Sequence, residues 1–477
     1  MHKVSLHPSF HIHKLVERER EMACSDGIKV VAEQNCTAEE VVIDIDESVA
    51  AMRSRLEQNR RGIPTTKNRR SVCIYKVPPG LTGISPKSIQ PEIVSIGPYH
   101  RGKKELSEFE SYKWWFLDGL LWQTKRDLKD YIGAMSRLEE STRSCYSDHQ
   151  ELSVSEFVEM MVLDGCFIIG LFRYVCESSG DDHVVDENDR DGNPILAMPW
   201  LIPILMRDLL KLENQLPFFV LERLYDISSD HRKGGDPLSL LAVKFFSNSL
   251  PRPPEVLKNS RMMEAEHLLD LFHLTFLPLQ GTSNNQYSSQ KLCHPSFKSI
   301  QCTTELRSSG IKFKPRKGAD SFLEINFRNW VLDIPPLTIN DFTTTFIINC
   351  LALEQCSHYT GTWFSTYITF MSCLLTCTRD VNLLCSDGII STGFSLNDQS
   401  VAQLFRKLGE NVGLEIRDCY LSEQFRDVES YYSSHWATLM RTYFSRPWSF
   451  ISVFSAFILL VLVGAQTAMA IMSYYNN

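Results

Sequence analysis

The C-terminal part of this sequence lacks charge. Residues 447–477 contain no Asp, Glu, Lys or Arg. As a helix rising 1.5 Å per residue, residues 449–472 are long enough to cross a hydrocarbon layer of about 30 Å. The apolar run 457–463 favours insertion into a membrane, and Gln466 is the one strongly polar residue that opposes it. The sequence therefore predicts a transmembrane anchor over residues 447–472 with a short tail at 473–477; the alternative is a buried core helix.

Particular residue types within this stretch support the anchor. Trp448 stands at one end, and Tyr474 with Tyr475 at the other, as in the aromatic belts of membrane interfaces. Gly464 and Ala468 are small and four residues apart, a spacing that permits close approach of another helix. The residues chosen for the anchor are Trp448, Phe457, Leu459, Leu460, Leu462, Gly464 and Ala468. Their expected partner is the lipid bilayer.

The N-terminus lacks the basic start and apolar stretch of a secretory signal. We therefore expect insertion after translation, as a single-pass protein of the plasma membrane or an endomembrane. Arg441 and Arg446 flank the apolar stretch on its upstream side only, which predicts that the main body is cytosolic. The sequon at Asn35 should then carry no glycan.

Several chemical signatures are also missing. The 14 cysteines include no CxxC pair, so we expect most of them to be free and buried, with neither a disulfide framework nor a zinc site. There is no nucleophile elbow, phosphate-binding loop, zinc-protease helix or kinase motif set. A net charge of −8 argues against nucleic acid as a partner. The sequence thus predicts no catalytic, cofactor-binding or metal-binding residues and identifies no small-molecule substrate.

Three carboxylates leave an enzymatic alternative open. Asp164, Asp208 and Glu213 lie within or beside apolar helical patterns and could converge as an acid–base pair. In the structural alternative, Asp164 bonds nearby backbone or an arginine, while the other two face water or cap a neighbouring turn. His267 and His273, six residues apart, fall on different helix faces, and we expect them to be structural.

Composition and periodicity predict an α+β, predominantly helical globular domain. The hydrophobic content of 43% is ordinary for a globular chain. Residues 1–70 read as a mobile arm with an amphipathic helix at 46–58, and residues 71–446 as the globular domain, mostly helical to about 279 and mixed after about 300. Helices are expected at 108–138, 155–175, 199–225 with an interruption at Pro217, 262–276, 341–358, 364–375 and 399–408. Strands or extended segments are expected at 71–78, 91–100, 322–327 and 331–339.

The segment 157–175 is apolar enough to suggest a second membrane span. Glu159 and Asp164 lie within it, however, and a central carboxylate costs about 2.5 to 3.5 kcal/mol on insertion. We therefore expect a buried helix here.

Several segments, taken in order, resemble a plant family of uncharacterised proteins, DUF247 or UPF0481. They are SVCIYKVPPGL (71–81), PEIVSIGPYH (91–100), Lys113-Trp114, FVEMMVLDGCFIIGL (157–171), DLLKLENQLPFFVL (208–221), TELRSSGIKF (304–313) and the C-terminal RPWSFISVFSAFILLVL. The resemblance implies one globular domain followed by a single C-terminal transmembrane helix. It brings no catalytic residues. Some grass members are implicated as male determinants of self-incompatibility, and the helix near 49–58 is similar to one in that branch.

Two classes of function follow from these observations. The first is a membrane-anchored plant protein with a non-catalytic recognition or signalling role through an unknown protein partner, in pollen self-incompatibility in the grass-like case. The second is a membrane-bound enzyme of an uncharacterised class that uses the buried carboxylates.

Overall fold

The computed structural model describes residues 72–148, 151–177, 198–229, 236–278, 300–357, 359–393, 396–413, 419–444 and 447–475, together with Val49, Met52 and Arg53. The chain divides into two units, Met1–Pro64 and Thr65–Asn477. In the first unit the three described residues are helical and exposed. The rest of the predicted helix at 46–58 and of the arm lies outside the described residues.

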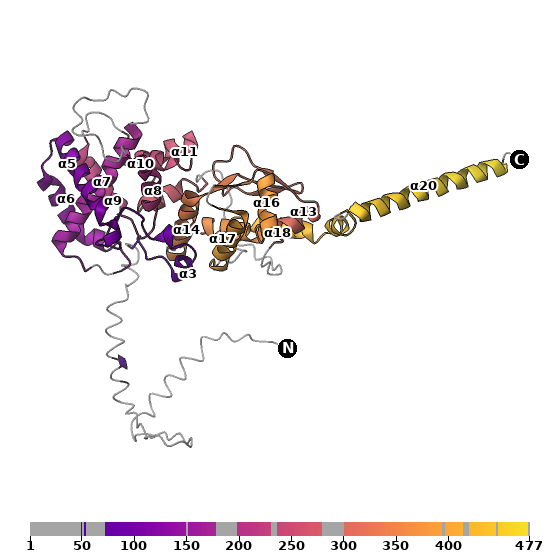
Figure 1. The fold of residues 1–477 in the computed structure, drawn as a ribbon, viewed down its shortest axis with the longest axis horizontal. Coiled ribbons are helices and arrows are strands. Elements are labelled where there is room, and N and C mark those ends of the chain that lie inside the picture. The colour runs from indigo at the N-terminus through magenta and orange to yellow at the C-terminus, as the bar shows by residue number, and fades with distance from the viewer. Residues whose placement is uncertain are drawn as a thin grey trace, which may run out of the picture. The chain divides into compact units, whose positions relative to one another are not determined.

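The first part of the second unit is built from helices (Figure 1). Two short helices are followed by a 3₁₀ helix and then by three longer helices. These are α3 (Pro79–Thr82), α4 (Pro86–Ile89), η1 (Lys104–Phe109), α5 (Glu110–Thr124), α6 (Leu128–Arg143) and α7 (Val154–Glu177). Shorter elements complete this part, namely α8 (Leu201–Asp208), α9 (Phe218–Ser228), α10 (Leu238–Ser247), α11 (Pro254–Asn259), η2 (Ser260–Met262) and α12 (Leu268–Leu274).

Local chemistry explains where these helices break. The predicted single helix at 108–138 is in fact two, because Lys125 adopts a left-handed conformation (φ 53°) and ends α5. Asp127 then caps α6 by accepting a hydrogen bond from the Lys129 N–H at 2.9 Å. The helix predicted at 155–175 is confirmed as α7. It packs against α5, α6, α9 and α10, so it is a buried core helix rather than a second span.

Two predicted helical patterns are shorter in the structure. The pattern at 199–225, expected to be interrupted at Pro217, is divided into α8 and α9, with turns between Leu209 and Pro217. The side chain of Gln215 donates to the carbonyls of Leu209 and Lys211 within these turns. The pattern at 262–276 retains only α12, which begins after His267, and His267 forms an isolated bridge with Pro217. Periodicity alone does not distinguish helices from such segments.

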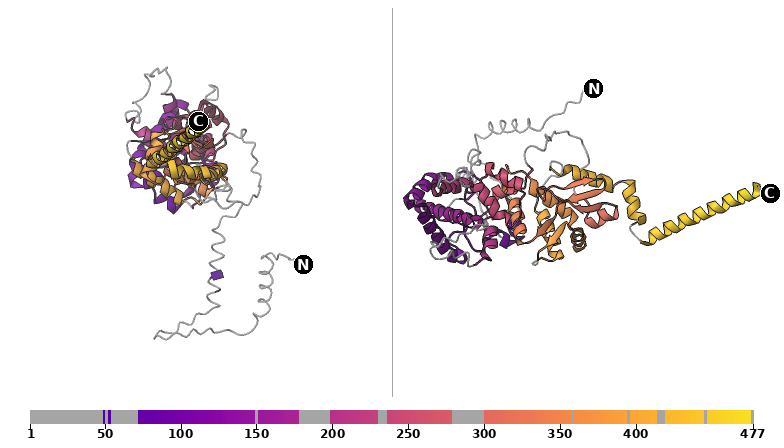
Figure 2. Two further views of the ribbon diagram at one scale, coloured as in Figure 1. Left: turned by 90° about the vertical axis from the view of Figure 1, so that its right-hand side faces the viewer. Right: turned by 90° about the horizontal axis from the view of Figure 1, so that it is seen from above.

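The later part of this unit combines two small sheets with helices (Figure 2). Its strands are β1 (Lys312–Pro315), β2 (Asn326–Arg328), β3 (Val331–Ile334), β4 (Leu337–Ile339) and β5 (Ile390–Thr392). The first sheet has the order β1-β3-β2, with β1 parallel and β2 antiparallel to β3, and β4 pairs in parallel with β5. The helices are α13 (Thr303–Ser308), α14 (Asp341–Cys356), α15 (Trp363–Leu374), α16 (Thr378–Ser386), α17 (Asp398–Glu410), α18 (Ser422–Tyr432) and α19 (His435–Leu439).

Several predictions for this later part are confirmed. α14, α15 and α17 fall where helices were expected, and Asn397 caps α17 by accepting from the Ser400 N–H at 2.8 Å. The run predicted at 331–339 becomes β3 and β4, separated at Pro335 and Pro336. Of the strand predicted at 322–327, only its last two residues enter β2.

A continuous row of phenylalanines joins the two parts of the unit. Phe172 of α7 contacts Phe246 of α10, with ring centroids 6.1 Å apart, and Phe246 contacts Phe272 of α12 at 5.2 Å. Phe272 then meets Phe346 of α14 at 4.9 Å, and Phe346 meets Phe364 of α15 at 5.5 Å. The helical part and the mixed part therefore share one hydrophobic core, in which α14 packs against helices of both.

The last elements are a π-helical turn, η4 (Met440–Phe444), and the long apolar helix α20 (Pro447–Tyr475), yellow in Figure 1. Among the described residues, α20 is the single unbroken helix that is long and apolar enough to cross a membrane. Its described side chains are exposed along the whole helix, so it does not serve as a core helix of the body.

Candidate functional site

The segment predicted as a strand at 91–100 has no strand partner within the described residues. It runs as turns and extended backbone, and side chains take the place of a neighbouring strand. Asp208, the last residue of α8, accepts hydrogen bonds from three consecutive backbone N–H groups, those of Glu92, Ile93 and Val94, at 2.8–3.1 Å. The prediction of a strand or an extended segment is therefore met by its second alternative, since alternating apolar residues indicate a buried extended chain but do not identify what pairs with its backbone.

Further along the same segment, two more side chains continue this pattern. Asn214 accepts a hydrogen bond from the Ile96 N–H at 2.7 Å and donates to the Val94 carbonyl at 3.0 Å. Asp164 of α7 accepts from the Gly97 N–H at 2.8 Å. Gly97 has φ +72°, and a Cβ at this position would lie 2.6 Å from the Gln215 carbonyl, so the close approach requires glycine.

Two buried lysines compensate the two aspartates. Lys113 of α5 donates to Asp164 Oδ1 at 2.6 Å and to the Ser95 carbonyl. Lys211 donates to Asp208 Oδ1 at 2.8 Å and to the Gln90 carbonyl at 2.6 Å. We call Lys113, Asp164, Asp208, Lys211 and Asn214 the clamp; all five are at most 1% exposed.

The contacts of the clamp bear on the two interpretations of the carboxylates. Asp164 and Asp208 converge on one segment, but each oxygen already accepts hydrogen bonds from backbone or lysine. The expectation that Asp208 faces water or caps a turn was wrong in its first half, since Asp208 is fully buried. Burial raises the pKa of Asp164, and the neighbouring Lys113 ammonium opposes that rise only in part. The arrangement holds the chain in place and leaves these two carboxylates no open position for a substrate.

Glu213 lies beside the clamp but binds different groups. It accepts a hydrogen bond from the Val77 N–H at 2.9 Å, and its Oε2 is 3.4 Å from Nε2 of His100. Burial raises the pKa of Glu213, but the contacts with His100 and the Val77 N–H outweigh burial and hold it below its usual value.

The two histidines have structural contacts, as expected. His267 caps α12, because its Nδ1 accepts from the Asp270 N–H at 3.1 Å, while its Nε2 is 3.2 Å from the Cys73 carbonyl. His273 lies 3.2 Å from Glu354 of α14. Glu354 in turn accepts hydrogen bonds from the N–H groups of Phe364 and Ser365 at the start of α15, both at 2.8 Å.

The cysteines match the prediction only in part. The eleven described cysteines are free, but fewer than half of them are buried, namely Cys73, Cys145, Cys166, Cys350 and Cys419. Across the described ranges no group of His, Cys, Asp and Glu is arranged to hold a metal ion.

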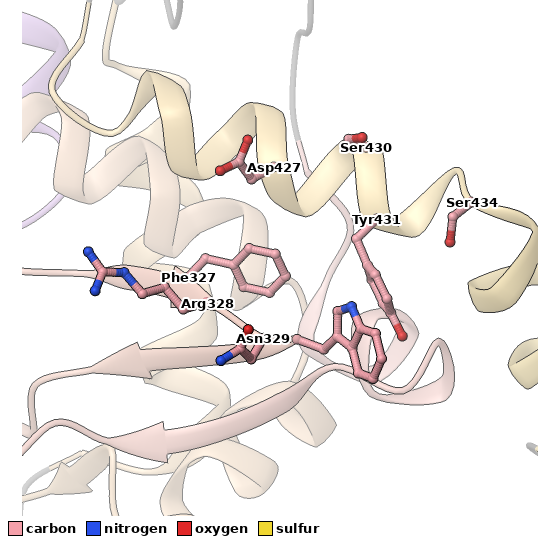
Figure 3. Close-up of a pocket in the computed structure, with 8 residues that line it drawn as sticks. Phe327, Arg328, Asn329, Asp427, Ser430, Tyr431 and Ser434 are labelled. Atoms are coloured by element: carbon pink, nitrogen blue, oxygen red, sulfur yellow. The ribbon is translucent and has the colours of Figure 1, made fainter.

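An aromatic cleft of about 710 Å³ opens between α18 and the β2–β3 hairpin (Figure 3). Tyr431 reaches from α18 toward the hairpin, and Phe327 lies beneath the helix. The ring of Trp330 is 5.9 Å from that of Tyr431, and 56% of Trp330 is exposed. The polar lining comes from Arg328, Asn329, Asp427, Ser430 and Ser434.

The hairpin turn in this cleft has an unusual sequence. Asn329 and Trp330 are its two central residues, and both have positive φ, 50° and 64°. Two-residue hairpins with this geometry favour Asn-Gly, and a bulky residue at positive φ is strained. Sequence reasoning missed the turn because Trp330 stands where glycine would have marked it. The useful signal was the two-residue gap, beginning with Asn, between two β-prone runs.

A second cleft, of about 400 Å³, lies between α4, α8, α14 and α17. Its cations are Lys87, Arg207 and Lys407, of which Arg207 bonds Glu92 at 2.9 Å. The lining also has two carboxylates, Glu92 and the exposed Asp341, and hydroxyl groups from Ser85, Ser88, Thr344, Thr345 and Ser400. Neither cleft is lined by Asp164, Asp208 or Glu213.

All the predicted anchor residues fall in α20, which continues to Tyr475, three residues past the predicted end. Phe457, Leu459, Leu460 and Leu462 are between 54% and 72% exposed. A Cβ added at Gly464 would meet nothing within 4 Å. Ala468 is exposed, and the side chain of Trp448 lies outside the described residues.

Fold and site together define a predominantly helical protein with a small mixed sheet and an apolar C-terminal helix, in which buried ion pairs secure an extended segment. A family model described as a plant protein of unknown function, DUF247, matches residues 74–462. The chain belongs to this family.

Curated relatives come from Arabidopsis thaliana. The UPF0481 protein At3g47200 is 34% identical over 434 residues, covering 85% of this chain and 88% of the relative. The putative UPF0481 protein At3g02645 is 21% identical over 490 residues, covering 83% and 89%. No solved structure shows a significant match to the chain.

Proposed function

We propose that this plant protein is anchored in a membrane by α20 and acts through non-catalytic contacts with another protein. The observation that carries the proposal is the combination of an apolar, charge-free helix with described side chains exposed throughout. In water such a surface is costly, and a hydrocarbon layer is the environment that fits it. The body would face the cytosol at the plasma membrane or an endomembrane, as Arg441 and Arg446 favour.

A non-catalytic role is supported by the state of the buried carboxylates. Asp164 and Asp208 accept hydrogen bonds from lysine and backbone on both oxygens, whereas a catalytic acid or base needs a position from which it can reach a substrate.

We place recognition at the second cleft, where Lys87 and Lys407 are exposed, and expect an acidic segment of a protein partner there rather than nucleic acid. The specific biological role that we propose is pollen recognition in self-incompatibility, which the resemblance to some grass members implies.

The anchor is tested in plant cells with a fluorescent tag on the N-terminus. Changing Leu460→Lys and Leu462→Lys together places two charges at the centre of α20, at a cost of about 2.5 to 3.5 kcal/mol each. We expect this variant to leave the membrane pellet after an alkaline wash. The matched control, Ser433→Lys with Thr442→Lys, adds the same charge upstream of α20 and should stay in the pellet. Retention of the centrally charged variant would contradict the anchor.

Orientation and recognition are measured on the same cells. Protease applied to intact, cytosol-facing membranes should destroy the tag, whereas protection of the tag would place the body on the other side.

For recognition, Lys87→Glu with Lys407→Glu should lose the proteins captured by the wild-type chain. Lys104→Glu with Lys129→Glu changes two exposed lysines of the helical part and should keep them. Equal capture by both variants would remove recognition from the second cleft.

A further inference from the structure

The sheet β1-β3-β2 has one basic face. Strand pairing puts Lys312, Val331 and Arg328 in one row across the sheet, because paired residues point to the same side. The next row on that side is Lys314, Asp333 and Asn326. The opposite face carries Phe313 and Leu332, which are buried, and Phe327, which is half-buried and lines the aromatic cleft.

The cations on this face are accessible and unpaired. Lys312, Lys314 and Arg328 are exposed, as is Lys317 just after β1, and within the described residues none of the four forms an ion pair. Arg316 bonds Glu324 at 3.0 Å, so that neighbouring pair adds no net charge. We call Lys312, Lys314, Lys317 and Arg328 the basic sheet face. Its nearest carboxylate in the strand register is Asp333.

One end of this sheet contacts the turn that leads into α20. The Lys312 N–H donates to the Trp330 carbonyl at 2.9 Å, so the start of β1 lies beside the hairpin tip. Gly310, two residues earlier, has φ +95°, and a Cβ built there would be 3.6 Å from Met440 Cε. Met440 begins η4, and α20 starts at Pro447.

A hydrogen bond fixes the same end. Tyr431 of α18 donates to the Ser309 carbonyl at 3.0 Å, and its ring faces Trp330. Lys312, Trp330 and the turn before α20 are thus held together by the fold rather than by a long linker.

Exposed aromatic and aliphatic side chains surround this junction. Trp330 is joined by Trp436, 52% exposed, and by Leu439, 40% exposed, both on α19 directly before η4. Tryptophan is enriched at the headgroup level of membranes, where its ring is amphipathic, and lysine and arginine stems also suit this region.

We propose that the basic sheet face and Trp330 dock on the anionic headgroups of the leaflet from which α20 emerges. The inference rests on the proposed anchoring by α20. Gly310 lies beside Met440 of η4, the turn that precedes α20, and Lys312 lies beside Trp330, so an anchored chain brings this face to the headgroups without a separate binding event. Anionic phosphatidylserine-type lipids of the cytoplasmic leaflet match its charge, and Trp330 with Trp436 match its interfacial depth.

The test uses the full chain in lipid nanodiscs of phosphatidylcholine, with or without phosphatidylserine. Incorporation into the disc is checked first, so failure of the anchor is seen separately from failure of docking. Amide hydrogen exchange of residues 312–334 is then measured by mass spectrometry. We expect slower exchange in the anionic discs, and high salt should restore the faster rate.

Three variants sharpen the result. Lys312→Gln with Lys314→Gln and Arg328→Gln should lose the lipid-dependent protection, by about fivefold for each charge removed. Lys104→Gln with Arg126→Gln and Lys129→Gln removes three exposed charges from the helical part and should keep the protection. Trp330→Gly should weaken protection while the hairpin stays folded, since glycine suits this turn.

Other results would overturn the docking. Equal exchange in neutral and anionic discs, in a chain that has entered both, would show that the face does not bind lipid. Protection by a soluble acidic peptide in neutral discs, with none from phosphatidylserine, would assign the face to an acidic protein instead. Equal loss of protection in both triple variants would show only a general effect of net charge.

Discussion

The clamp and the basic sheet face both use lysine, in opposite ways. Lys113 is 1% exposed and bonds Asp164 at 2.6 Å, whereas Lys312 is exposed and makes no ion pair with the described residues. A buried charge must be compensated and so fixes the chain around it, while an exposed charge remains available to a partner. Within one unit, the buried lysines have structural contacts, and the exposed lysines are the ones to which we assign the proposed docking.

The family resemblance falls mainly on the structural side of this division. Four of the resembling segments, 91–100, 113–114, 157–171 and 208–221, meet at the clamp. Residues shared for this reason stabilise the fold and do not identify a substrate. Four substitutions would test the contrast between the two regions.

The largest effect is expected for Asp208→Asn. The amide would direct a donor at backbone N–H groups and leave the Lys211 ammonium without its carboxylate, which should lower the free energy of unfolding by about 3–5 kcal/mol. Urea unfolding followed by circular dichroism measures the loss. Asp118→Asn, an exposed carboxylate on α5, is the control and should change stability by less than about 0.5 kcal/mol. Equal effects of the two changes would remove the distinction between clamp and surface.

Lys113→Met should cost slightly less, about 3 kcal/mol, because Asp164 keeps its hydrogen bond from Gly97. Adding Asp164→Leu removes the uncompensated carboxylate and should recover much of that loss, as measured by the same unfolding curves. A double variant that is simply the sum of the two single losses would show that the ion pair has no special coupling.

On the other side of the comparison, Trp330→Gly should stabilise the body by about 1 kcal/mol, since glycine relieves the positive φ of 64°. The melting temperature reports this gain. Trp114→Ala removes a similarly exposed tryptophan from α5 and should have little effect on the melting temperature. A lower melting temperature for Trp330→Gly would mean that its ring contact with Tyr431 outweighs the backbone strain.

The smallest effect concerns acid, and its direction differs between regions. Burial raises the pKa of Asp380 in α16, but hydrogen bonds from Thr304, Thr376 and Cys377 outweigh burial and lower it overall. Its stabilisation is thus present above about pH 4 and is lost as the pH falls through the lowered pKa. Asp164 has a raised pKa, so its contribution has the opposite sign.

Unfolding of wild type and Asp380→Asn across acidic pH measures this effect. The difference in stability between the two should be constant near neutrality and should shrink below about pH 4. A difference that stays constant to low pH would show that Asp380 keeps an ordinary pKa.

Local pattern explains which parts of the fold the sequence predicts. Helix α17 follows from its apolar stripe and the Asn397 cap, because both are determined within a few residues. For the segment at 91–100 the sequence left strand and extended chain open, because its hydrogen-bond partners, such as Asp208, come from more than a hundred residues away. The candidate surface at Trp330 was missed for a different reason, since strain at one residue leaves no periodic trace.

The long-range bonds of Asn349 also order events during synthesis. This side chain in α14 accepts from the Leu212 N–H at 2.9 Å and donates to the Ser88 carbonyl at 2.7 Å, contacts that span 137 and 261 residues of chain. Contacts of such high sequence separation form slowly, and here they cannot form before α14 has left the ribosome. Helix α20 is translated after α14, so these long-range bonds can form while the last part of the chain is still being made. If α20 anchors the protein as we propose, the core of the body can therefore close before the apolar helix is complete.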